Sequence, residues 1–111
     1  MKIDKHDKYI VLGDEKDDVG RFATYLERIV PERYENDNLV IDLLKYEDLT
    51  LDDLLMFLKL SNYHRSTKHS FVLVNDRIDV DDVPLEMILV PSLVEAGDIV
   101  EMEEIERDLG F

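Results

Sequence analysis

The segment from Leu39 to Asp76 constrains the fold of this chain most strongly, because it has the pattern of a strand, a helix and a second strand. Leu39 to Leu44 and Phe71 to Val74 are short apolar runs, and the helical pattern from Leu54 to Tyr63 lies between them. Strands that are buried on both faces are continuously apolar, and parallel strands need a crossover of about this length. The segment therefore predicts a right-handed crossover unit in a parallel part of a sheet.

The flanking segments extend this unit into a larger sheet with further helices. We expect an edge strand at Ile3, a strand at 8–12, a helix that Asp17-Asp18 opens and Pro31 ends, and a strand at 87–90. A last helix follows the Ser92 capping box and runs to Leu109, with Gly110 as its C-terminal stop. The predicted fold class is α/β, a mixed β-sheet with helices in the order β-β-α-β-α-β-β-α. It forms a single two-layer domain over residues 1–111.

The charge of the chain limits its partners. The net charge is −14, from 27 acidic and 13 basic residues, so the surface repels phosphate backbones and we expect no direct nucleic-acid binding. Residues 76–111 carry 12 acidic and two basic residues, which predicts either a solvated acidic face or a docking surface for a basic partner. The chain has no cysteine and no apolar run of about 20 residues, so we expect a cytoplasmic protein that does not enter a membrane.

No residue pattern indicates catalysis or a cofactor. His6, His64 and His69 lack the spacing of a metal-binding pair, and we expect His64 and His69 to be solvent-exposed near a helix end. The paired carboxylates lie in turns, whereas general acid–base catalysis needs a buried carboxyl with a shifted pKa. The sequence therefore predicts a protein that is not an enzyme and holds no metal or cofactor.

From Asp42 to Val74 the order of an apolar strand, a loop-to-helix junction, a leucine-rich helix and a second apolar strand resembles the STAS domain. This is the fold of bacterial anti-sigma factor antagonists, and residues 87–109 are similar to the C-terminal end of that family. The family carries Asp-Ser-Ser-Gly-Leu-Gly at the junction, and one of these serines accepts phosphate from a kinase that is also the anti-sigma factor. The resemblance implies a regulatory domain that acts by binding another protein.

Here the junction reads Thr50-Leu51-Asp52-Asp53-Leu54-Leu55, and Asp52 falls at the phosphoserine position of the family. No phosphorylation site is therefore expected. A carboxylate at this helix start is a fixed negative charge that mimics the phosphorylated state. The alternative is that Asp52 and Asp53 only cap and charge the first turn of the helix. The family also places a helix between its last two strands, whereas residues 76–82 have the pattern of an acidic loop.

The helix after Thr50 carries a second apolar stripe besides its core stripe, formed by Met56, Leu60 and Tyr63. Such a stripe indicates an exposed interface, a homodimer contact included, unless a neighbouring helix buries it. The predicted partner is an anti-sigma factor or a kinase-like regulator. The predicted protein-binding residues are Thr50, Asp52, Asp53, Met56, Leu60, Tyr63, Asp76 and Asp79.

Two other functions remain open at this point. The end of the chain, Glu101 to Phe111, resembles that of short proteins called ribonuclease Z, which would make the protein a hydrolase or part of one. Enzymes of that name resemble metallo-β-lactamases and hold zinc with a His-x-His-x-Asp-His cluster, which this sequence lacks. The second alternative is an acidic inhibitor that mimics nucleic acid, with Glu103 and Glu106 of the last helix on its contact face.

Overall fold

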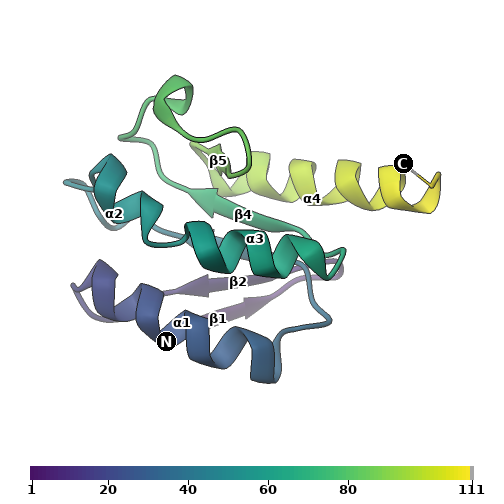
Figure 1. Ribbon diagram of the computed structural model, residues 1–111, viewed down its shortest axis with the longest axis horizontal. Helices are drawn as coiled ribbons and strands as arrows, with labels where there is room; N and C mark the ends of the chain where they lie inside the picture. Colours follow the sequence, from purple (N-terminus) through teal and green to yellow (C-terminus); the bar gives the residue numbers. More distant parts are fainter. Residues whose placement is uncertain (111) are drawn as a thin grey trace.

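The structure, a computed structural model, describes residues 1–110 (Figure 1). The predicted order of strands and helices is confirmed, with the central helix divided in two and one 3₁₀ turn added. The elements are β1 (Lys2–Lys5), β2 (Ile10–Gly13), α1 (Val19–Arg33), β3 (Leu39–Asp42), α2 (Leu51–Leu55), α3 (Leu58–Ser66), β4 (Phe71–Val74), η1 (Val80–Asp82), β5 (Ile88–Val90) and α4 (Leu93–Asp108).

The five strands form one mixed sheet in the order β1-β2-β3-β4-β5. β1 is antiparallel to β2, and each later pair is parallel. Leu39 lies opposite Phe71 and Ile41 lies opposite Leu73, so the two apolar runs that the crossover joins are paired neighbours. The predicted parallel crossover unit is confirmed.

Helices cover both faces of this sheet, so the prediction of two layers is wrong. Leu12, Ile41 and Leu73 point to the face that α1, α2 and α3 cover, and Val40 and Val72 point to the face that α4 covers. Successive side chains of a strand point to opposite faces, so continuously apolar strands require a cover on each side. α4 supplies the third layer, behind the sheet from α1 and α3 (Figure 1).

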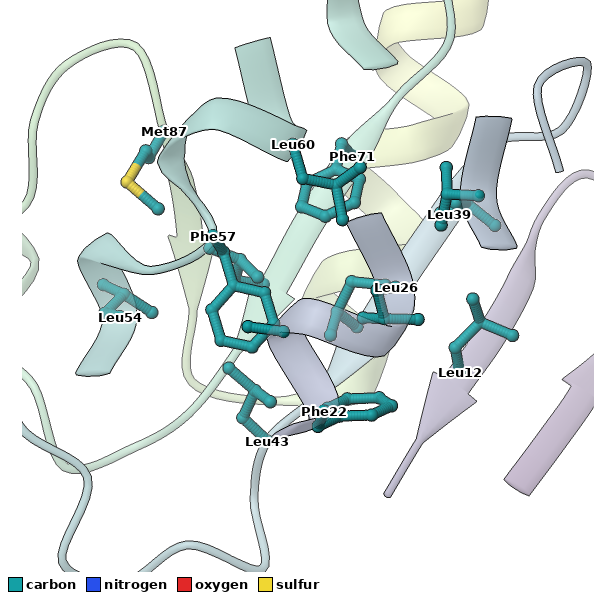
Figure 2. Packing of buried hydrophobic residues seen from close by; sticks show 14 of the residues in the cluster. Leu12, Phe22, Leu26, Leu39, Leu43, Leu54, Phe57, Leu60, Phe71 and Met87 are labelled. Carbon is teal, nitrogen blue, oxygen red and sulfur yellow. The ribbon is translucent and has the colours of Figure 1, made fainter. Parts of the chain in front are cut away.

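The larger core lies between the sheet and the first three helices (Figure 2). Leu26 of α1, Leu54 of α2 and Phe57 beyond it are fully buried against strand residues such as Leu39 and Phe71. Complete burial of one such side chain stabilises a fold by about 1.5–3 kcal/mol. This core holds α2 and α3 in fixed positions over the sheet.

Three of the predicted helix starts are confirmed by their capping hydrogen bonds. The side chain of Asp18 accepts from the Arg21 N–H at 3.1 Å, and the hydroxyl of Ser92 accepts from the Glu95 N–H at 3.2 Å. Thr50 caps α2 in the same way. Such caps satisfy N–H groups that have no partner inside the helix.

Two predictions about helix bounds are wrong. Pro31 does not end α1, which continues to Arg33, because proline in the last turn removes only one backbone donor and Tyr34 N–H still reaches the Val30 carbonyl at 2.9 Å. The central helix breaks after Leu55, where Phe57 N–H bonds to the Leu54 carbonyl in a tighter 3₁₀-like turn. Leu54 and Phe57, three positions apart, both face the core.

α4 buries a narrower stripe than its apolar positions predict. Ala96, Gly97 and Val100 face the sheet, whereas the side chains of Met102 and Ile105 are exposed by half or more. Nearer the C-terminus of α4, the side that faces the protein carries the polar residues Glu103, Glu104 and Arg107, which form hydrogen bonds near the starts of β3 and β4. The helix is therefore apolar on two sides, and only one side is packed.

Candidate functional site

Three loops lie together at the edge where the parallel strands end. Residues 14–18 follow β2, residues 45–53 lead from β3 into α2, and residues 76–82 follow β4. We call these three segments the carboxyl-end surface. They hold twelve acidic and three basic residues. In open α/β sheets this edge is the usual position of a functional site.

Lys45 and Tyr46 connect the first two of these loops. The Lys45 ammonium donates to the backbone carbonyls of Asp14 at 3.2 Å and Lys16 at 2.6 Å, and it forms an ion pair with Asp17 at 3.2 Å. The Tyr46 hydroxyl donates to the Asp14 carboxylate. The acidic loop after β2 is therefore held against the loop after β3.

The charges in this contact are set by the same hydrogen bonds. Burial by itself would raise the pKa of Asp14, but the Tyr46 hydroxyl, the Lys16 N–H and the Lys45 charge outweigh it, and the pKa lies below its usual value. Burial raises the pKa of the Tyr46 hydroxyl, and the bond to Asp14 raises it further. Asp14 is thus a carboxylate and Tyr46 a hydrogen-bond donor at neutral pH.

Asn75 attaches the third loop to the second. Its side chain is buried and donates to the carbonyls of Leu43 at 2.9 Å and Tyr46 at 3.1 Å. Its amide oxygen accepts from the Arg77 N–H at 2.8 Å. Sequence reasoning overlooked this residue, although a lone asparagine directly after the apolar strand Phe71–Val74 was a usable signal.

Thr50, Asp52 and Asp53 begin α2 within the carboxyl-end surface. Thr50 and Asp53 form a complete capping box, in which each side chain accepts from the other residue's N–H at 3.1 Å. Asp52 is exposed, and no hydrogen bond or ion pair engages its carboxylate within residues 1–110. Capping therefore accounts for Asp53, whereas Asp52 is a solvent-facing charge.

The predicted stripe of Met56, Leu60 and Tyr63 is not one surface. Leu60 is only 3% exposed and belongs to the core, so its place among the protein-binding residues is wrong. Leu60 lies on the buried face of α3, which it shares with Ser61 and His64. Met56 is 46% exposed beside the carboxyl-end surface, whereas Tyr63, 40% exposed, lies near the far end of α3.

Asp76 and Asp79 lie in the loop after β4, and both are exposed. Asp76 pairs with Arg77 at 3.5 Å, and the Asp79 side chain accepts from the Asp81 N–H at 2.9 Å at the start of η1. Ile78 packs against the core between them. The segment is therefore the predicted acidic loop, with one 3₁₀ turn added. The packing of Ile78 against the core keeps the acidic residues at the edge of the sheet.

The expectation of an exposed His64 is wrong. Its ring is fully buried, and Nε2 donates to the Asp37 carbonyl at 2.7 Å, while Nδ1 has no partner within the described chain. Burial lowers the pKa of His64, so its ring is neutral at pH 7. His6 is exposed and bonds to Asp4, and His69 is partly buried. Residues 1–110 contain no cluster of three or more potential metal-ligating side chains.

A second polar cluster, which sequence reasoning missed, lies at the opposite edge, where β3 and β4 begin. The buried Asn38 side chain donates to the Lys8 carbonyl at 3.0 Å and to Glu104 at 2.9 Å. It accepts from the Ser70 N–H at 2.8 Å and from Arg107 at 3.2 Å. This cluster fixes the last turns of α4 against the starts of the strands.

Glu103 belongs to the same edge rather than to a solvated acidic face. It forms an ion pair with Arg65 at 2.9 Å, and only 13% of its side chain is exposed. Burial alone would raise the pKa of Glu103, but bonds from Arg65 and Ser70 lower it below the usual value. Its predicted role on the contact face of a nucleic-acid mimic is therefore wrong, whereas Glu106 is exposed.

Comparison with known proteins adds no assignment: no protein-family model matches the chain, and the search of curated proteins gives no match. Within the described residues, no helix is both long and apolar enough to cross a membrane.

Proposed function

We propose that this chain is a non-enzymatic, STAS-like regulatory domain that binds a protein partner through the carboxyl-end surface. The contact residues are Thr50, Asp52, Asp53, Met56, Asp76 and Asp79. The main support is the convergence of three acidic loops on one edge, next to the exposed Met56. A charged surface with one apolar anchor is typical of a protein contact.

The loops of this surface are anchored before any partner arrives, which favours a binding role. Asn75, Lys45 and Tyr46 tie the three segments together through the hydrogen bonds described above. A partner therefore does not have to order the loops, and the entropic cost of association is smaller. The exposed carboxylates remain available because these anchors use mainly backbone carbonyls.

The chemistry of the surface specifies a basic partner. With twelve acidic and three basic residues, it attracts Lys- and Arg-rich surfaces and repels acidic ones. The resemblance to anti-sigma factor antagonists favours an anti-sigma factor or a kinase-like regulator as this partner. In that role Asp52 supplies a permanent charge where the family places a phosphorylated serine, and the contact is not switched by phosphorylation.

The test is affinity capture followed by a quantitative binding measurement with the captured, purified protein. Asp52→Lys should weaken binding about tenfold, because it reverses a charge at the centre of the contact. Asp98→Lys is the matched control, since it reverses an exposed charge on α4, on the other face of the sheet. Its affinity should stay within about twofold of wild type.

Equal affinities for wild type and Asp52→Lys would refute this contact surface. A chain that captures no other protein but self-associates, with Asp52→Lys removing the association, would make a second copy of the chain the partner. Catalytic turnover by the purified protein would refute the non-enzymatic role.

A further inference from the structure

The basic residues of this acidic protein gather at the edge where the parallel strands begin. A hollow of about 870 Å³ there is bordered by β1, the starts of β2 and β3, the end of α1 and the end of α4. A smaller hollow of about 360 Å³ adjoins it and shares three lining residues with it. We call the two together the amino-end groove. Its cationic side chains are Lys5, Lys8, Arg33, Arg65, Lys68 and Arg107.

This grouping is uneven for the composition of the chain. The groove holds six of the 13 lysine and arginine residues but only three of the 27 acidic residues, Asp7, Asp37 and Glu104. The rest of the molecule is correspondingly more acidic than its net charge of −14 indicates. The strands therefore run from a basic edge to an acidic edge.

Most of these cations are not neutralised by the protein itself. Across residues 1–110, Lys5, Lys8, Arg33 and Lys68 take part in no ion pair, whereas Arg65 is paired with Glu103. Like charges that face one shared hollow repel each other, and an anion between them removes that repulsion. The groove therefore favours an anionic occupant.

The floor of the groove is rigid. Arg107 donates to Asn38 at 3.2 Å and to the Ser70 hydroxyl at 3.3 Å, and Asn38 is itself held by Lys8 and Glu104. One guanidinium nitrogen of Arg107 is thus fixed in place by neutral oxygens rather than by a carboxylate. Its charge stays available to a ligand, as anion recognition by arginine requires.

Lys68 is placed at the groove by an unusual backbone conformation. Its φ is +67°, in the left-handed region that non-glycine residues seldom adopt. It is the one non-glycine residue with positive φ in the part of the chain that the structure describes. Lys68 directly follows the C-cap of α3, where a left-handed residue commonly ends a helix, and its N–H donates to the Arg65 carbonyl at 3.1 Å. This conformation projects the loop between α3 and β4 between the two hollows, both of which Lys68 lines.

We propose that the amino-end groove binds a small molecule carrying at least two phosphate groups. The volume of the main hollow is within the range of small-molecule sites, and the cations along the groove offer more charged donors than a single phosphate group can engage. Long nucleic acids are disfavoured, because their phosphates beyond the groove meet the acidic remainder of the surface. At physiological salt, charges more than about 8 Å away are largely screened, so the local cations dominate over the net charge.

The test is isothermal titration of the full chain with inorganic pyrophosphate and, separately, inorganic phosphate in 150 mM NaCl. Pyrophosphate should bind saturably with one site, and phosphate at least tenfold more weakly, because it carries less charge and offers fewer acceptor oxygens to the cations. Lys68→Gln should weaken pyrophosphate binding about tenfold, as expected for loss of one charged hydrogen bond. Lys8→Gln with Arg33→Gln tests the larger hollow alone and should weaken binding by a similar factor.

Lys59→Gln is the matched control, because Lys59 is an exposed lysine of α3 that does not line the groove. It should leave the affinity within about twofold of wild type. These side chains are exposed, so thermal unfolding of each variant should match wild type. Absence of saturable pyrophosphate binding, or equal losses in Lys59→Gln and Lys68→Gln, would overturn the proposal. Binding of an acidic peptide but not of pyrophosphate would also overturn it and assign the groove to a protein.

Discussion

The buried His64 predicts an acid-sensitive fold between pH 7 and pH 5. Its ring packs 5.8 Å from that of Phe71 and is excluded from solvent, with one bond from Nε2 to the Asp37 carbonyl. Burial lowers the pKa of His64 below the ordinary value of about 6.5 for a histidine in water. In the unfolded chain the same ring is in water and takes up a proton near pH 6.5.

The sign of the effect follows from proton uptake. Below about pH 6.5 the unfolded state binds a proton at His64 that the folded state does not bind, so the free energy of unfolding falls as the pH falls. The contribution of the neutral His64 to the free energy of unfolding is fully present above pH 6.5. As the pH falls, this contribution is lost at up to roughly 1 kcal/mol per pH unit, until the pH reaches the pKa of His64 in the folded protein. Glu103 and Asp14, whose pKa values are lowered, act in the same direction but only below about pH 4.5.

The assay is urea unfolding of the protein with His64 and of His64→Gln at pH 7.5, 6.5, 5.5 and 5.0. Glutamine keeps a side-chain donor for the Asp37 carbonyl but does not titrate. The difference in unfolding free energy between the two proteins should shrink from pH 6.5 to 5.5, by at most roughly 1 kcal/mol, because only the protein with His64 must keep a buried imidazole neutral. Both proteins carry His69→Gln, because the His69 ring lies 6.0 Å from that of His64 and its charge contributes to the pKa of His64. A difference that stays constant from pH 7.5 to 5.0 would show that His64 is not held neutral by the fold.

Two further predictions concern packing. Phe57→Ala should lower the free energy of unfolding by about 3–5 kcal/mol, because Phe57 is fully buried with its ring 6.4 Å from that of Phe22. The neighbouring Met56 is half-exposed, so Met56→Ala should lower it by less than about 1 kcal/mol. Equal urea midpoints for the two variants would contradict this prediction. A Cβ at Gly97 would lie 2.8 Å from the Tyr9 hydroxyl oxygen, so Gly97→Ala should lose most of its helix-propensity gain of about 1 kcal/mol in wild type and recover it in a Tyr9→Ala background. Identical effects of Gly97→Ala in the two backgrounds, measured by urea unfolding, would refute this contact.

The features that the sequence predicted well are those decided by near neighbours. Asp18, Thr50 and Ser92 cap helices because a short oxygen-bearing side chain reaches an N–H three residues ahead, whatever the rest of the fold does. The apolar runs at β3 and β4 likewise required burial on both faces. Helix caps and apolar strands can therefore be predicted without knowing which helices and strands contact each other in the fold.

The features that it missed depend on tertiary contacts. The apolar stripe that contains Leu60 fits an exposed interface or a helix covered on a second side, and only the packed fold shows that Leu60 belongs to the core. The position of His64 near a helix end predicts exposure, but the ring donates to the Asp37 carbonyl, 27 positions earlier in the chain. Asn38 acquires its role only where loops distant in sequence converge, and no local pattern separates it from an ordinary turn asparagine, whereas Asn75 at least directly follows an apolar strand.

The two proposed sites lie at opposite ends of the same strands, and this arrangement bears on whether they influence each other. A four-residue strand spans about 13 Å, which exceeds the screening length of about 8 Å at physiological salt. A phosphate-bearing ligand at the amino-end groove therefore changes the electrostatic attraction at Asp52 very little. The paired, buried strands between the sites offer no alternative arrangement through which a contact would be transmitted. Binding of pyrophosphate and of the protein partner should then be independent, so Lys68→Gln leaves partner affinity unchanged and Asp52→Lys leaves pyrophosphate affinity unchanged. Coupling greater than about threefold between the two measurements would require a movement of α4 or of the α2–α3 break that this structure does not contain.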